Sequence, residues 1–225
     1  MIKMKKIIAI LLALSCVVAL ASCGANDVDT VGAMFEASKP TKTVITTTQS
    51  FGSTILSGEY VMQTGLIDGK AATVYSAKYD ELLSVDEGGA SDLIQGDVVV
   101  REETREYLEG KGVRVDGGAW DASGENFALE SGPVSLNLSS EYIKTFEYKN
   151  NHLRCVVAAK NTAEVLGLEE DLTADASIEI TDDGASVTSV VISYTLAADA
   201  ESQLPATDII IRADYYYDLQ KIEIK

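Results

Sequence analysis

The residue types that carry out much of protein chemistry are scarce in this chain. Histidine occurs once, as His152, and cysteine three times, as Cys16, Cys23 and Cys155. Because zinc sites combine several cysteines and histidines, this composition excludes an ordinary zinc site. There is no C-x-x-C pair, no G-x-S-x-G elbow and, after the N-terminal segment, no S-x-x-K, so the common redox and serine-hydrolase motifs are missing. We therefore expect no enzyme, no catalytic residues, no cofactor and no bound metal.

Positive charge is scarce as well. Lysine and arginine number 18 against 35 aspartates and glutamates, a formal net charge of −17. Nucleic-acid binding depends on neutralising phosphates with basic residues, so we expect no nucleic-acid partner. Like charges also repel the chain from the surface of an anionic membrane. The acidity has two possible meanings. We favour a soluble surface whose charges repel one another, and we expect a monomer. The alternative is an acidic face that binds cations or a basic partner.

Long hydrophobic runs are missing except at the N-terminus. Three lysines within the first six residues precede the apolar stretch Ile7–Leu14, and apolar residues resume at Val17–Leu20. A basic start followed by an apolar segment and small residues is typical of an export signal. At about 14 apolar residues the segment is shorter than the ~20 that cross a bilayer, which makes a retained membrane span the weaker reading.

The end of this segment reads Leu20-Ala21-Ser22-Cys23. It resembles the lipobox of bacterial lipoproteins, which implies cleavage before Cys23 and a diacylglyceryl group on the Cys23 thiol. Two acyl chains give stable membrane attachment, whereas one gives only reversible binding. Residues 1–22 are then a signal peptide that takes Cys16 with it, and residues 23–25 are a lipidated tether. The alternative is a secreted protein with a free thiol at Cys23.

Processing would place the protein outside the cytoplasm, anchored to the cell membrane by the lipid on Cys23. Removing the three leader lysines changes the formal charge from −17 to −20. With Cys23 lipidated, Cys155 has no intramolecular partner, so we expect no disulfide. Its surroundings, "HLRCVVAA", favour a buried small hydrophobe over a reactive thiol.

The mature chain begins with a predicted helix over residues 26–38. Val28, Val31, Met34 and Phe35 share one helical face, with Asn26 or Asp27 available as the N-cap, and Pro40 follows. A tether of about four residues places the start of this helix within roughly 15 Å of the lipid headgroups. We expect the folded part to lie close to the membrane.

Beyond the first helix, the pattern is one of strands joined by tight turns. Hairpin signals occur at Asp68-Gly69, Gly110–Gly112, Asn150-Asn151 and Asp183-Gly184. A second short helix is predicted in "NTAEVLGLEEDL" at 161–172, where Asn161 or Thr162 could cap the start. Hairpins throughout require antiparallel pairing. We predict a mainly β (α+β) fold in which residues 26–225 form a single domain.

The segments "DTVGAMFEASKPTKTVITTTQSF", "NNHLRCVVAAKNTAEVLGL", "GASVTSVVISYTL" and "YYYDLQKIEIK" occur in that order along the chain. Their helix, hairpin and strand-then-helix arrangement resembles the LolA/LppX-type lipoprotein half-barrels, including relatives in Gram-positive bacteria. The resemblance implies a curved antiparallel sheet partly closed by helices around an apolar space, which in some members holds a lipid or acyl chain. Many strand positions here carry Thr, Ser or Ala, which argues against a wide apolar cavity.

Strand alternation selects a set of residues that could face a ligand. These candidates are Tyr60, Met62, Tyr75, Ile192 and Tyr194. Packing within the core or on the sheet surface is the commoner use of such residues and is the favoured reading. Acidic pairs such as Glu102-Glu103 are expected to be solvated, and Asp116, Asp121 and Glu125 to serve turns in preference to Ca²⁺, because their spacing differs from an EF-hand loop.

Two functions remain open at this point. The first is a lipoprotein that binds or carries an apolar or amphipathic ligand. The second is a cell-surface module that binds another protein and takes up no small ligand.

Overall fold

A computed structural model describes residues 27–82, 97–127, 136–198, 205–218 and 221–224. Ten strands form one sheet, and every pairing is antiparallel. The expected mainly β class is confirmed. The strands are β1 (Lys42–Phe51), β2 (Thr54–Ile67), β3 (Lys70–Leu82), β4 (Val98–Leu108), β5 (Gly112–Val115), β6 (Ile143–Lys149), β7 (His152–Val157), β8 (Ala176–Asp182), β9 (Val187–Leu196) and β10 (Thr207–Tyr216).

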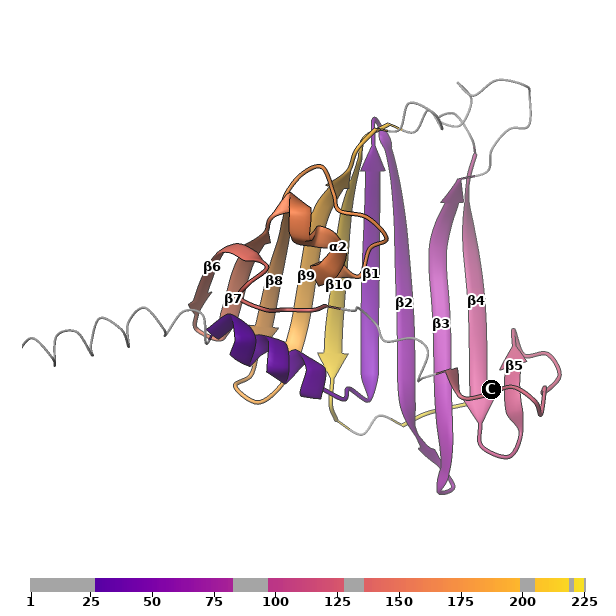
Figure 1. The fold of residues 1–225 in the computed structure, drawn as a ribbon. Helices are drawn as coiled ribbons and strands as arrows, with labels where there is room; N and C mark the ends of the chain where they lie inside the picture. The colour runs from indigo at the N-terminus through magenta and orange to yellow at the C-terminus, as the bar shows by residue number, and fades with distance from the viewer. Residues whose placement is uncertain (1–26, 83–96, 128–135, 199–204, 219–220, 225) are drawn as a thin grey trace, which may run out of the picture.

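The sheet is built from two meanders that meet in its middle. The strand order is β5-β4-β3-β2-β1-β10-β9-β8-β7-β6, so the first and last strands are neighbours. Lys42 of β1 lies opposite Tyr216 of β10, and the pairing continues to Ser50 opposite Asp208. Figure 1 shows the resulting curved sheet, with β5 and β6 at its two open ends.

The tight turns occur where the sequence predicts them. Asp68 and Gly69 have φ of 51° and 76°, and Asn150 and Asn151 have φ of 53° and 60°. Two successive residues with positive φ form the type I′ turn, whose twist matches that of the strands it joins. Asp, Asn and Gly tolerate this conformation better than other residues, and this explains why the chain reverses at these dipeptides.

Helical segments cover one half of one face. The N-terminal helix occupies residues 27–37, close to the predicted 26–38. The short helices η3 (Ala159–Asn161) and α2 (Thr162–Leu166) follow β7, and Gly167 ends α2 with φ 65°. Asn161 lies at the N-cap position, but its side chain makes no capping bond and donates to the Tyr142 carbonyl instead. Figure 1 shows the helices in front of the half that contains β6 to β10.

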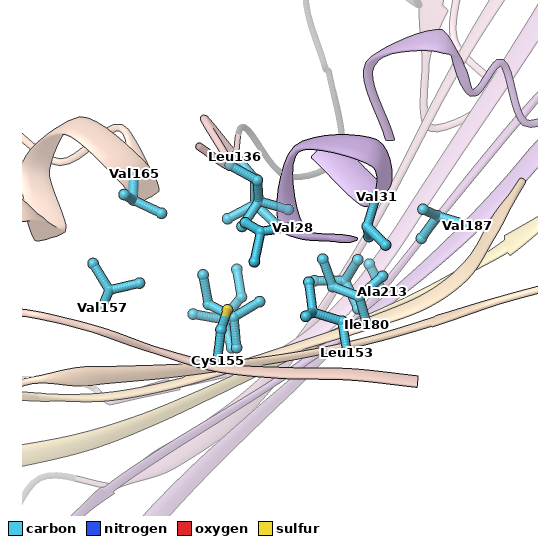
Figure 2. Packing of buried hydrophobic residues seen from close by; sticks show 14 of the residues in the cluster. Val28, Val31, Leu136, Leu153, Cys155, Val157, Val165, Ile180, Val187 and Ala213 are labelled. Atoms are coloured by element: carbon cyan, nitrogen blue, oxygen red, sulfur yellow. The ribbon is translucent and has the colours of Figure 1, made fainter. Parts of the chain in front are cut away.

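The hydrophobic core lies between these helices and the sheet. As Figure 2 shows, Val28 and Val31 of the N-terminal helix point toward the part of the sheet that carries Leu153 and Ile180, and Val165 of α2 lies above Val157. All six are at most 1% exposed. The periodicity of the first helix is therefore confirmed. Among the described residues, this cluster takes in the first part of β1 and strands β6 to β10, and no residue of β2 to β5.

The face that carries Ile45, Ile180 and Ile192 and meets the helices is called the inner face, and its opposite the outer face. The outer face is also covered where Ile222 lies against β2. A Cβ built on Gly65 would lie 2.9 Å from Ile222 Cδ1. The absence of a side chain at Gly65 therefore lets the C-terminal segment pack on the sheet.

Candidate functional site

The strand register places all five ligand-facing candidates on the inner face. Tyr60 lies opposite Ile45 of β1, which packs against the helix-bearing core. Met62 lies opposite Tyr75 across β2 and β3. On the other half, Ile192 and Tyr194 lie opposite Ile211 and Ile209 of β10. Since residues in register on adjacent strands point to the same face, a single surface holds all five.

Three of the candidates join a fourth residue in one group. Tyr60, Met62, Tyr75 and Tyr79 are half-buried neighbours on β2 and β3, and this set is called the tyrosine cluster. The rings of Tyr60 and Tyr79 are stacked, with centroids 6.2 Å apart and an angle of 14° between their planes. An offset stack of this kind presents a wide, rigid aromatic surface.

Two small residues make room for the rings. Gly58 lies opposite Tyr79, and a Cβ built on it would lie 2.9 Å from both Cε2 and the hydroxyl oxygen of Tyr60. The Tyr60 ring therefore lies across Gly58 and toward Thr47 of β1. Ala77, which is 5% exposed, lies opposite Tyr60, and its small side chain leaves room for the tyrosine rings on either side. The cluster thus depends on missing side chains as much as on those present.

The two remaining candidates lie apart from the cluster. Ile192 is 3% exposed and belongs to the hydrophobic core, where Tyr194 packs at its edge. Strands β10 and β1 separate β9 from β2, and with strands spaced ~4.8 Å apart this is a separation of roughly 14 Å. Burial raises the pKa of Tyr194 above its ordinary value. A ligand-facing role for the five residues stays a prediction.

Charged side chains border the cluster on β4. Arg101 lies opposite Tyr79 and forms an ion pair with Glu81, while Glu103 lies opposite Ala77. Arg105 lies opposite Tyr75, and its guanidinium carbon is 4.8 Å from the centre of the Phe127 ring. The inner face of β2 to β4 is therefore aromatic on one side and charged on the other, a combination suited to an amphipathic molecule.

Burial, then the carboxylate of Glu103 and the phenols of Tyr60 and Tyr79, raise the pKa of Tyr75 above its ordinary value of 10.0. The folded state thus favours the neutral phenol. This contribution to stability is complete below pH 10.0 and is lost as the pH rises toward the folded-state pKa.

Replacing Glu103 with Gln is expected to lower the pKa of Tyr75 while leaving it above 10.0, because the substitution removes a repelling charge and keeps the burial. The measurement is an ultraviolet titration of tyrosinate, with a Tyr75→Phe variant to isolate the signal. The matched control is Glu102→Gln, since Glu102 is on the outer face in an ion pair with Lys78. An unchanged or higher Tyr75 pKa in Glu103→Gln would contradict the expectation.

Sequence reasoning overlooked Tyr79, Gly58 and Arg105 as parts of this site. Tyr79 could have been found, because period-two alternation places it on the same face as Tyr75. Gly58 and Arg105 carry no such signal. Their roles depend on which strands are neighbours and on how Tyr60 and Phe127 pack above the sheet.

Other candidates have structural surroundings. Asp116 accepts hydrogen bonds from the Thr104 backbone at 2.7 Å, and Asp121 accepts from Ser123 Oγ at 2.6 Å. The Asp121 contact lies within a turn, as expected, whereas Asp116 binds across to β4. Within the described ranges, no group of acidic, His or Cys residues could hold a metal ion. Cys155 is 4% exposed, and burial raises the pKa of its thiol to about 12. The expectation of a buried small hydrophobe is confirmed.

His152 lies on the outer face, in a depression of about 470 Å³ that Glu179, Thr181, Arg212 and Asp214 also line. Arg154 donates to His152 Nε2 at 3.1 Å, and Arg212 is paired with Asp214 at 2.8 Å. The charges here have protein partners, as on a solvated sheet surface.

The predicted lipidation site Cys23 and the signal segment 1–22 lie outside the described residues. Within the part of the chain that the structure describes, no helix is long and apolar enough to cross a membrane. The anchor therefore stays a prediction from the sequence.

Comparison with known proteins gives distant likenesses only. No family model matches the sequence, and no curated protein matches it. Among solved structures, a DUF1329 family protein from Desulfovibrio piger is 8% identical, with a TM-score of 0.25, over 86% of this chain and 92% of that one. A proposed outer membrane lipoprotein-sorting protein domain from Vibrio parahaemolyticus is 10% identical, with a TM-score of 0.24 and the same coverage. At TM-scores of this size the likenesses carry no inference about this chain.

Proposed function

We propose that this chain is an extracytoplasmic lipoprotein, anchored through Cys23, that binds an apolar or amphipathic ligand on the inner face of its sheet. The observation that carries the proposal is the tyrosine cluster. Its side chains are half-buried, they lie on the face that elsewhere forms the core, and the described helices cover the other half of that face. Aromatic side chains supply large contact area at little conformational cost, and this favours ligand binding there.

The test uses the chain from residue 23 onward with Cys23→Ser, which retains every described residue and lacks the lipid. Solvent extracts of the purified protein are examined by mass spectrometry for a ligand. The delipidated protein is then titrated with the neutral fluorescent probe N-phenyl-1-naphthylamine. Tyr79→Ala is expected to weaken probe binding about tenfold, because it removes half of the aromatic stack.

Tyr216→Ala is the matched control, because Tyr216 is 44% exposed on the outer face of β10. Equal losses in the two variants would place probe binding elsewhere. Absence of both a co-purifying ligand and probe binding would refute the proposal.

A second function, binding of another envelope protein, is favoured by one feature of the outer face. Ile55 of β2 and Val98 and Val100 of β4 are 65%, 47% and 58% exposed, and they lie at the same end of the sheet with β3 between the two strands. Exposed apolar residues that gather together often mark interaction surfaces. Photo-crosslinking in intact cells distinguishes the two functions. A photoreactive residue replaces Val100, and the same replacement of Thr188 is the control. A protein captured from position 100 and not from position 188 would support this alternative. If no protein is captured from position 100, the alternative is rejected.

A further inference from the structure

The inner face of β2 to β5 carries two cations, and they have different surroundings. Arg101 is paired with Glu81. For Arg105, no carboxylate of the described residues lies within the 4.0 Å of an ion pair. The third arginine of this region, Arg114 of β5, pairs with Glu106 on the outer face and does not approach Arg105. In a chain with 35 acidic residues, a half-buried arginine that has no carboxylate partner among the described residues is unusual.

Packing holds Arg105 in place instead. Its guanidinium lies 4.8 Å from the centre of the Phe127 ring, and Phe127 is itself only 3% exposed. A buried ring fixes one face of the guanidinium plane and leaves the N–H donors at its edge. These donors match the oxygens of a carboxylate or phosphate in a two-point geometry.

Arg105 also lies beside the tyrosine cluster. It is directly opposite Tyr75, and Tyr75 is directly opposite Met62. The three residues form one row across β4, β3 and β2, which spans roughly 10 Å between the outer members. Glu103 is a carboxylate on this face, and it lies in the next row, opposite Ala77. Its charge opposes anion binding, while its position leaves the row of Arg105 open.

We infer that Arg105 binds the anionic headgroup, a carboxylate or phosphate, of an amphipathic ligand whose apolar part lies on the tyrosine cluster. The inference rests on the proposed function and narrows its ligand class to anionic amphiphiles. The attraction acts in partly desolvated surroundings, where a charge pair is stronger than in bulk water.

The experiment compares four probes of one chain length on the unlipidated chain from residue 23. Dodecanoate and dodecyl phosphate carry the anion, dodecanol is neutral and dodecylamine is cationic. Isothermal titration calorimetry is expected to show both anions binding at least about tenfold more tightly than dodecanol, and the amine more weakly. Inorganic phosphate without an alkyl chain is expected not to compete. If inorganic phosphate does compete, Arg105 binds a free anion, and the inference that its ligand is an anionic amphiphile is overturned.

Arg105→Gln is expected to remove the preference for the two anions over dodecanol. Arg101→Gln is the matched control on the same strand and face, and it is expected to keep the preference. Arg105→Lys retains the charge without the planar fork, and we expect a reduced preference. This second variant keeps the test decisive if Arg105→Gln fails to fold, as judged by thermal unfolding.

The outcomes separate the two proposals. Dodecanol binding without an anion preference, or a preference that survives Arg105→Gln, overturns the role of Arg105 and leaves the proposed function standing. Failure of all four probes to bind also overturns the role of Arg105, and the proposed function is then decided by the co-purifying ligand and the naphthylamine titration.

Discussion

Replacing Ile180 with Ala is expected to lower the free energy of unfolding by about 2–5 kcal/mol, the range for truncation of a buried aliphatic side chain. Ile180 is fully buried on β8, where it lies opposite Val190 and Leu153 and faces the N-terminal helix. The truncation leaves a cavity between helix and sheet that the backbone cannot close. The measurement is urea unfolding followed by circular dichroism.

The matched control is Ile210→Ala on β10. Ile210 has the same side chain but lies on the outer face with 46% of its surface exposed. Its truncation is expected to change the free energy of unfolding by within about 0.5 kcal/mol, as at most surface sites. Similar losses at the two positions would contradict the assignment of the inner face as the core.

Replacing Gly112 with Ala is expected to be the second large effect, through backbone geometry instead of lost packing. Gly112 has φ 87°, in the region that disfavours side chains by about 1–2 kcal/mol. A Cβ at this position would lie 1.9 Å from the Asp121 carbonyl oxygen. Separating the two segments strains the reciprocal bonds between Val113 and Asp121, at 2.9 and 2.6 Å, and such overpacking costs about 1–3 kcal/mol more.

Gly69→Ala separates these two causes. Gly69 has a similar φ of 76° in the β2–β3 turn, but a Cβ there would meet nothing within 4 Å. It is expected to show the conformational cost alone, so thermal unfolding of the two variants side by side measures the contribution of the contact. Equal losses would show that the close approach of Asp121 is unimportant.

The Gly112 contact also bears on the proposed anion site. The segment that begins at Asp121 continues to Phe127, whose ring supports the Arg105 guanidinium. We therefore expect that a displaced Asp121 segment also weakens the selectivity for anionic amphiphiles.

The tyrosine cluster was only partly accessible from the sequence. Alternation within one strand placed Tyr60 with Met62, because neighbouring side chains point to opposite faces. The contact between β2 and β3 followed from the Asp68-Gly69 turn that joins them. The stack of Tyr60 on Tyr79 did not follow, since it depends on the empty volume over Gly58 and on a rotamer that strand pattern leaves open. Likewise, nothing in the sequence predicts that Arg101 pairs with Glu81 while Arg105 has no carboxylate partner among the described residues.

Local sequence patterns were enough to predict most of the strands and helices and the turns between them. Turn dipeptides such as Asn150-Asn151, the spacing of Val28 and Val31, and the strand alternation all act between residues close in the chain, and local chemistry therefore suffices to predict them. Three features became visible only in the folded chain: β1 pairs with β10, the helices cover β6 to β10, and the tyrosine cluster lies beyond the helices. These features arise from contacts between distant segments, where the burial of the whole apolar surface selects the arrangement and no local pattern specifies it.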